Sequence, residues 1–167
     1  MAQTMHLKRR RSIPTFFVAT LGTLLLGTLA GWFSGSKRGY TALVLPPATP
    51  PNIVFPIVWT VLYIMIGMSL FFIMRTWAVT DALEDDRKVA TFLWALQFFF
   101  NLAWPFAFFT LRLYAFSALW LAVLVGVNIA LMLYAFRVKM IAGWLLVPYQ
   151  AWLTFAFYLN LFVAILN

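Results

Sequence analysis

The sequence contains no cysteine and only one histidine, His6, in a chain of 167 residues. Without cysteine there is no disulfide framework, no thiolate nucleophile and no cysteine-based metal site. His6 lies in the polar N-terminal tail, so the apolar segments offer no histidine to haem iron, to hydrolysis or to ordinary zinc catalysis. We therefore expect no metal site, no obligatory cofactor and no conventional catalytic constellation.

Charge is scarce as well. Only 10% of the residues are charged and 65% are hydrophobic, and the mean hydropathy is +0.94. Soluble domains contain about 25% charged residues, so this composition predicts an all-α polytopic membrane protein. The net charge of +8 comes from basic residues at the ends of apolar runs rather than from one stripe, which argues against nucleic acid as a partner.

Five apolar segments follow a basic tail that covers residues 1–12. Each segment approaches the roughly 20 residues that a helix needs to cross a bilayer. A signal peptide is the alternative for the first segment, but its length and the lack of an A-x-A site favour a retained helix. Short connections predict one five-helix bundle over residues 13–167, with spans at 13–33, 53–74, 89–110, 113–136 and 141–165 and a first loop at 34–52.

The distribution of lysine and arginine predicts the orientation in the membrane. The N-terminal tail and the second and fourth loops carry nine of these residues, whereas the opposite side carries three. Loops that face the cytoplasm are enriched in lysine and arginine. We expect the N-terminus in the cytoplasm, and the C-terminus and loop 34–52 on the outside.

All four acidic residues lie in one connection, at Asp81, Glu84, Asp85 and Asp86. Asp81 with Glu84 three residues later is typical of the first turn of a helix, where acidic groups suit the positive end of the helix dipole. A solvated helix start is the favoured interpretation, and a metal site built from these acids is the alternative.

The expected spans contain no charged residue, which argues against a proton-coupled transporter. Their polar groups are uncharged, and Gln97, Asn101 and Trp104 share one face of the third span. These amides serve either as hydrogen bonds between helices or as part of a binding site. On the fifth span, Trp144 and Trp152 share a face with Pro148, whose missing N–H leaves a carbonyl to be satisfied elsewhere.

Eight tryptophans require an explanation. Trp32, Trp77 and Trp144 suit the aromatic belt at the membrane surface. Trp59, Trp104 and Trp152 lie deeper or share a face with polar groups, which is the arrangement of a pocket for a flat aromatic ligand. Packing within the bundle is the alternative for the same residues.

Three stretches together resemble the TspO/MBR family, which comprises tryptophan-rich sensory proteins and translocator proteins, also called peripheral-type benzodiazepine receptors. The first is YTALVLPPATPPNIVFPIVWTVLY, from Tyr40 to Tyr63. The second is QFFFNLAWPFAFF in the third span, and the third is WLLVPYQAWLTFAFYLN in the fifth. They occur in the family's order on a chain of the expected length.

The resemblance implies a five-helix bundle, usually a homodimer, with a pocket in each protomer that the first loop covers as a lid. Family members bind tetrapyrroles such as protoporphyrin IX and haem, and animal members also bind cholesterol and synthetic isoquinoline carboxamides or benzodiazepines. Small Ala156 would leave room opposite the aromatic residues, and the prolines of the loop would stiffen the lid. Carried over by motif, the ligand-binding residues are Tyr40, Pro50, Trp59, Tyr63, Asn101, Trp104, Trp152 and Ala156.

Two positions in the first loop depart from the family pattern. Leu45 stands where the family has a lysine, and Ala48 stands where it has an aromatic residue. Both changes weaken the expectation that the loop pairs a ligand carboxylate or stacks on the ligand.

The resemblance leaves several functions open. A sensor of porphyrin occupancy is the first, and a carrier of porphyrin or sterol is the second. Some bacterial relatives are linked to light-dependent porphyrin breakdown that depends on the positions of Trp59 and Trp152, so an enzymatic role also stays open. A structural membrane protein whose tryptophans only pack against each other is the remaining alternative.

Overall fold

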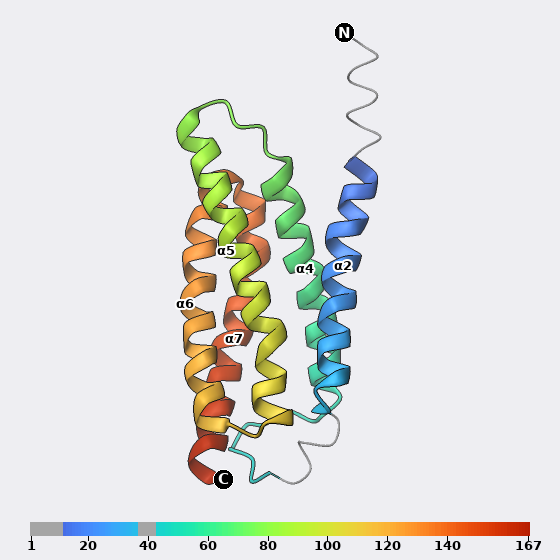
Figure 1. Cartoon of the computed structure of the whole chain (residues 1–167), viewed down its shortest axis with the longest axis vertical. Helices are drawn as coiled ribbons and strands as arrows, with labels where there is room; N and C mark the ends of the chain where they lie inside the picture. The colour runs from blue at the N-terminus through green and yellow to red at the C-terminus, as the bar shows by residue number, and fades with distance from the viewer. Residues whose placement is uncertain (1–11, 37–42) are drawn as a thin grey trace.

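The computed structural model describes residues 12–36 and 43–167, and five long helices make up most of that part of the chain (Figure 1). All five are long and apolar enough to cross a membrane, which confirms the expected all-α, five-span architecture. The chain is therefore an integral, multi-pass membrane protein. The helices are α2 (Ser12–Phe33), α4 (Val54–Arg75), α5 (Asp81–Pro105, extended by the π-helix η2, Phe106–Thr110), α6 (Tyr114–Val138) and α7 (Met140–Leu166).

The helices form an antiparallel bundle in which α6 packs along both α5 and α7, and α4 packs between α7 and α2. Helix α2 lies at the edge of the bundle and contacts α4 along most of its length. The start of α2 and the end of α7 lie at opposite ends of the bundle, as an odd number of spans requires. The interior is filled by aliphatic side chains such as Ile66, Leu124 and Leu146, which have no exposed surface.

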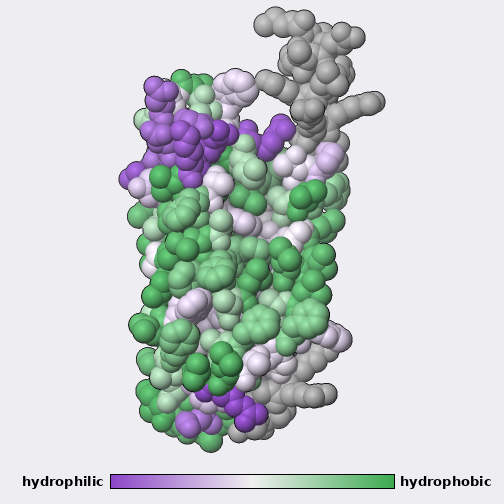
Figure 2. Space-filling view, in the orientation of Figure 1, coloured by the Kyte–Doolittle hydropathy of each residue, from purple (hydrophilic) through white to green (hydrophobic). Residues whose placement is uncertain are grey.

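The outer surface of the bundle is apolar. Figure 2 shows hydrophobic residues around its middle and hydrophilic residues gathered at the two ends. Large side chains such as Leu25, Phe92 and Leu133 are more than half exposed on this surface. Since a helix satisfies its backbone hydrogen bonds internally, such a surface is stable against lipid hydrocarbon.

Helix α5 begins at Asp81, several residues before the apolar segment that starts at residue 89. Thr80 caps it, because its side-chain oxygen accepts a hydrogen bond of 3.2 Å from the backbone N–H of Leu83. The acids pair with neighbouring cations, as in the Glu84–Arg87 contact of 2.6 Å. Asp81 and Glu84 thus lie in the first turn of a capped helix, as expected. Among the described residues, no group of three or more potential metal ligands occurs.

The end of α5 differs from a regular helix. Pro105 lacks a backbone N–H, and the five residues after it form a π-helix in which the N–H of Leu111 bonds the carbonyl of Phe106 at 2.9 Å. The chain then turns at Arg112, which has a positive φ of 56°. The wider π-turn changes the direction of the aromatic side chains that follow Pro105, which the regular helical period does not predict.

The described part of the first loop, residues 43–53, crosses the end of the bundle beside α7 (Figure 1). Residues 46–49 form a tight turn in which Ala48 has a positive φ of 66°. Tyr158 of α7 and Asn167, which directly follows that helix, hold this segment. Tyr158 donates its hydroxyl to the carbonyl of Pro47 at 3.2 Å, and the amide of Asn167 bonds both the N–H and the carbonyl of Val44 at 3.0 and 3.1 Å.

Candidate ligand-binding cavity

A cavity of about 790 Å³ lies inside the bundle at the end where residues 43–53 cross it. Its walls come from α2, α4, α5 with η2, and α7, while α6 contributes nothing to them. It exists because α2 stays close to α4 and makes few contacts with α5, so the space between them is not filled by backbone. The volume lies within the range of about 300–1,000 Å³ that is usual for small-molecule sites.

Six of the eight residues expected to bind ligand line this cavity: Trp59, Tyr63, Asn101, Trp104, Trp152 and Ala156. Pro50 is not among the lining residues, and Asn52 and Ile53 line the cavity instead. Tyr40 lies outside the described residues. Residues from three distant parts of the chain therefore meet at one place, as the three sequence stretches predict.

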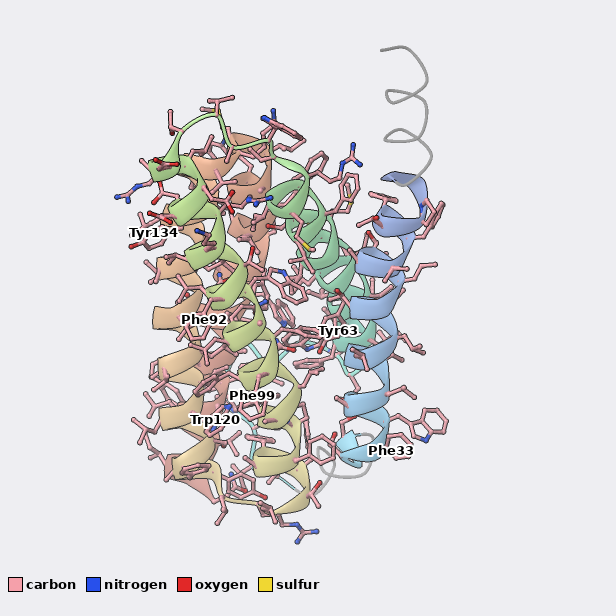
Figure 3. The ribbon with its side chains drawn as sticks, turned by 45° about the horizontal axis from the view of Figure 1, so that its top comes forward. Phe33, Tyr63, Phe92, Phe99, Trp120 and Tyr134 are labelled. Atoms are coloured by element: carbon pink, nitrogen blue, oxygen red, sulfur yellow. The ribbon has the colours of Figure 1, made fainter. Side chains whose placement is uncertain are left out.

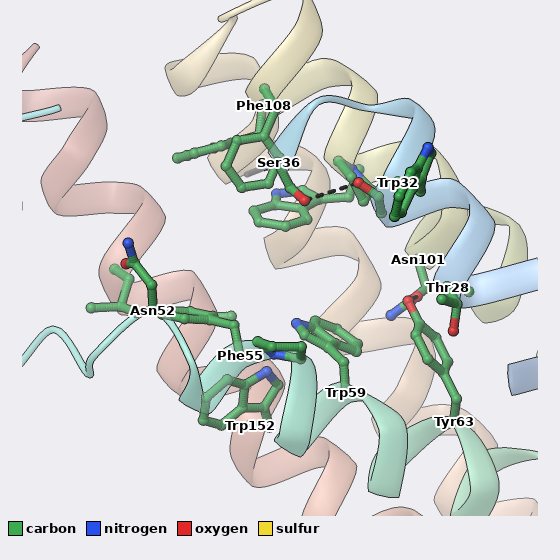
Figure 4. A pocket seen from close by; sticks show the side chains of 18 of the residues that line it. Thr28, Trp32, Ser36, Asn52, Phe55, Trp59, Tyr63, Asn101, Phe108 and Trp152 are labelled. Atoms are coloured by element: carbon green, nitrogen blue, oxygen red, sulfur yellow. Dashed lines mark hydrogen bonds between the residues drawn. The ribbon is translucent and has the colours of Figure 1, made fainter. Parts of the chain in front are cut away.

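Aromatic rings form most of the wall that α4 and α7 share. The Trp59 ring stacks on Tyr63 with 5.3 Å between centroids, and it meets the buried Tyr149 edge-on at 6.4 Å. Trp152 meets Phe55 edge-on at 5.8 Å (Figure 4). On the α5 side, Trp104 stacks on Phe108 at 5.2 Å. The cavity thus has aromatic rings from α4, α5, η2 and α7 in its lining, which suits a flat apolar ligand.

The polar groups beneath the cavity form a continuous hydrogen-bonded chain. Tyr63, which lies between α4, α2 and α5 (Figure 3), donates its hydroxyl to Asn101 Oδ1 at 2.9 Å. Asn101 Nδ2 donates to the Tyr149 hydroxyl at 2.9 Å, and that hydroxyl donates to Gln97 Oε1 at 3.0 Å. The amides therefore link α4, α5 and α7. Asn101 keeps one acceptor lone pair and one N–H for a further contact, because a carboxamide has two of each.

A second amide joins the walls near the membrane surface. Asn160 accepts a hydrogen bond from Trp104 Nε1 at 3.0 Å and donates to the backbone carbonyl of Tyr114 at 2.9 Å. These two hydrogen bonds hold the Trp104 ring against α7 and link α5, α6 and α7 to one another. Asn160, the last residue of the third stretch that resembles the family, also lines the cavity.

Helix α2 supplies a wall that the sequence motifs did not indicate. Gly27 is buried, and a Cβ atom there would collide with the ring of Tyr63, so only glycine lets α2 approach α4 so closely. Gly31 lies one turn further on and faces open space in the cavity. Trp32 is 70% exposed and also lines the cavity, so its membrane-surface role does not exclude contact with a ligand.

Two buried polar atoms near this site have no hydrogen-bond partner among the described residues. They are Gln97 Nε2, at the inner end of the hydrogen-bonded chain, and Trp152 Nε1, in the wall of the cavity. A buried donor without an acceptor costs about 1–3 kcal/mol, so each is a place where an additional acceptor would be stabilising. Among the described residues, no charged side chain lines the cavity. Stacking, apolar contact and hydrogen bonds are therefore the interactions that it offers.

Comparison with known proteins agrees with this geometry. The TspO/MBR family matches residues 18–166. The chain is 38% identical to the tryptophan-rich protein TspO of Chlorobaculum tepidum over 83% of its own length and 81% of that protein. It is 33% identical to protein CrtK of Rhodobacter capsulatus over 93% and 94% of the two chains, and 31% identical to the translocator protein of Bos taurus over 86% and 87%. The chain therefore belongs to the TspO/MBR family.

Proposed function

We propose that this protein is a membrane receptor or sensor that binds tetrapyrroles, such as protoporphyrin IX or haem, in the cavity described above. The observation that carries the proposal is the set of tryptophans on its walls: Trp59 of α4 and Trp152 of α7 (Figure 4), together with Trp104 of α5. A porphyrin is a flat, mainly apolar ring, and its faces would stack on indoles and displace little ordered water from such walls.

The cavity also favours a particular orientation of this ligand. Since the described lining carries no charge, the apolar edge of the ring would point inward, toward Tyr63 and Asn101. The carboxylates of a porphyrin would lie toward the mouth, where Ser36 and Asn52 supply polar groups. Burying a carboxylate without a partner would cost several kcal/mol. Sterols and benzodiazepine-type compounds are flat and apolar as well, so we propose them as further ligands of the same walls.

The test is a titration of protoporphyrin IX into the purified protein, followed by tryptophan fluorescence, with Trp59→Phe and Trp152→Phe beside the wild type. Trp77→Phe is the matched control, because Trp77 is 74% exposed and does not line the cavity. We expect saturable quenching that weakens in the two cavity variants and is unchanged in the control. Quenching that does not saturate, or identical titration curves for all four proteins, would mean that the porphyrin partitions nonspecifically. Either result would contradict the proposed binding site.

A carrier and a light-dependent breakdown activity remain alternatives to the sensor, and all three need the same binding site. A carrier would move porphyrin across proteoliposome membranes, whereas a sensor would bind without flux. Breakdown would appear as a loss of porphyrin absorbance under illumination that requires Trp59 and Trp152. We favour the sensor because the described cavity lining has no ionisable group of the kind that couples transport to an ion gradient.

We further propose a homodimer. A Cβ atom added at Gly22 of α2 or at Gly126 of α6 would meet no other atom within 4 Å, so each glycine leaves a shallow place on the bundle for a second copy. Gly27 does not contribute, because it is occupied by Tyr63 within the same protomer. Cross-linking in native membranes would test the dimer.

The orientation also stays a proposal, with the N-terminus in the cytoplasm and residues 43–53 outside. Labelling of single introduced cysteines at the two ends of the bundle by an impermeant maleimide would test it, since the chain has no cysteine of its own. If the start of α2 is labelled from outside intact cells, the orientation is the opposite of the proposed one.

A further inference from the structure

A second hollow opens on the outer surface of the bundle, between α4 and α7. This groove has a volume of about 600 Å³, and all of its lining side chains are apolar. Ile57 and Ala151, on its two rims, are exposed on the transmembrane surface. The α4 residues that line the groove run from Ile57 to Met65, and the helix starts at Val54. At a rise of 1.5 Å per residue, the groove therefore lies within about 17 Å of the start of α4, which is close to the hydrocarbon depth of one leaflet.

One side chain separates this groove from the central cavity. Among the described residues, Trp152 alone lines both hollows. On the cavity side its ring meets Phe55 at 5.8 Å, and on the groove side it meets Phe155 at 5.5 Å. Trp152 therefore stands between the two hollows, and its Nε1 has no hydrogen-bond partner among the described residues to hold the ring in place.

The end of the bundle is closed much more firmly. Tyr158 and Asn167 bond the backbone of residues 44 and 47 through three hydrogen bonds, and a further bond ties the turn at Thr49 to Pro46. A ligand that entered from water past residues 43–53 would meet a segment that these contacts hold in place. A ligand that entered through the groove would have to move only the ring of Trp152.

We propose that the groove between α4 and α7 is the entrance by which a flat apolar ligand dissolved in the bilayer reaches the cavity, with Trp152 as its gate. This inference rests on the proposed function, because it concerns the route to the same binding site. Such a ligand concentrates in hydrocarbon, where the groove opens, rather than in the water above the loop. On arrival, an acceptor group on the ligand would satisfy the indole N–H, which favours reclosure of the gate behind it.

The absence of cysteine allows a direct test. In the variant Ala151→Cys the single thiol lies on the rim of the groove, and in Ile129→Cys it lies on the exposed surface of α6, away from both hollows. Each variant is labelled in detergent with a bulky maleimide, reconstituted into lipid nanodiscs, and mixed with protoporphyrin IX in a stopped-flow instrument. Tryptophan quenching reports the association rate, and dilution into empty liposomes reports the dissociation rate.

A blocked entrance slows association and dissociation equally, because it raises the barrier without changing the bound state. We expect both rates to fall by about tenfold in labelled Ala151→Cys, with an unchanged Kd, and to stay the same in labelled Ile129→Cys. The double variant Tyr158→Phe, Asn167→Ala, which frees the loop, should leave both rates within about twofold of the wild type. The opposite pattern, with fast rates in the loop variant and no effect of the label, would overturn the groove as the route.

The two proposals fail in different ways. If no variant and no wild-type sample shows saturable quenching, the proposed ligand is wrong and the route to it falls as well. If saturable binding occurs with identical rates in both labelled variants, the cavity binds the ligand but the groove is not its entrance.

Discussion

The two halves of the bundle differ, although both are built from the same apolar helices. In the half near the start of α5, Ile73, Ala90, Ala135 and Ala142 have no exposed surface, and small residues let the helices approach closely. In the half near residues 43–53, large aromatic rings stand apart around a cavity. Close packing is the ordinary state of a protein interior, so the hollow half is the part of the molecule whose packing serves a ligand.

The filled half depends on close contact between backbones. A Cβ atom on Gly67 of α4 would lie 2.6 Å from the carbonyl oxygen of Ala19 and 2.7 Å from the Cα of Thr20. Ser69 adds a hydrogen bond of 2.9 Å to the carbonyl of Ala142 in α7. These contacts hold α2, α4 and α7 together at one end, so that the same helices can diverge at the other.

The largest effect is expected from Gly67→Leu, which would make the filled half unable to close. Because the colliding atoms belong to the backbone of α2, they cannot move aside, and we expect a loss of about 3 kcal/mol or more of stability, at the upper end for overpacking. Thermal unfolding in detergent measures it. Gly31→Leu is the control, since nothing lies within 4 Å of the Cβ position there; an equal loss in both variants would contradict the account of the α2–α4 contact.

The second largest effect is expected from filling the hollow half. Gly31→Leu places a side chain in the open space of the cavity, so we expect protoporphyrin IX to bind about tenfold more weakly, or about 1.4 kcal/mol, without loss of stability. Gly22→Leu adds the same side chain to the same helix outside the cavity and should bind the ligand as the wild type does. Equal binding by the two variants would show that the ligand does not occupy the space beside α2.

The hollow half was partly predictable from sequence. Trp59 with Tyr63, and Asn101 with Trp104, are spaced by three or four residues, so each pair had to share a helical face. Which face turns inward was not predictable, because these helices are apolar on all sides and periodicity gives no direction. The three motifs indicated which faces of α4, α5 and α7 turn toward the interior.

The remaining parts of the site had no such signal. None of the three motifs covers Gly27 or Gly31, and only the packed structure separates the glycine that admits Tyr63 from the one that leaves space. Phe109 also lines the cavity, although it follows Trp104 by five residues, a spacing that a regular period of 3.6 residues places off the Trp104 face; the wider π-turn after Pro105 brings it nearer to that face. The extent of the lid depends on contacts between segments more than 100 residues apart.

A smaller effect is expected where the two halves join, at the hydrogen-bonded chain. Asn101→Leu removes the common partner of the Tyr63 and Tyr149 hydroxyls, and we expect a loss of about 1–2 kcal/mol, because two buried hydroxyl groups lose a bond. Thr154→Val is the control, since its hydroxyl is exposed and bonds only within α7. Unfolding midpoints of the two variants, measured side by side, test this expectation. If Asn101→Leu is as stable as the control, the hydrogen-bonded side chains order the tyrosines without stabilising the bundle.

The smallest effect on stability is expected at the closed end of the cavity. Asn167→Ala removes both hydrogen bonds to Val44, so the Val44 amide should exchange its proton about tenfold faster, while global stability changes by no more than about 0.5 kcal/mol. Hydrogen exchange followed by mass spectrometry of the peptide containing residues 43–53 measures the change. Tyr158→Phe should loosen the same peptide through Pro47 and leave Val44 bonded to Asn167. If neither variant alters exchange there, the proline-rich segment is held by its own stiffness, and α7 does not fasten it over the aromatic half of the bundle.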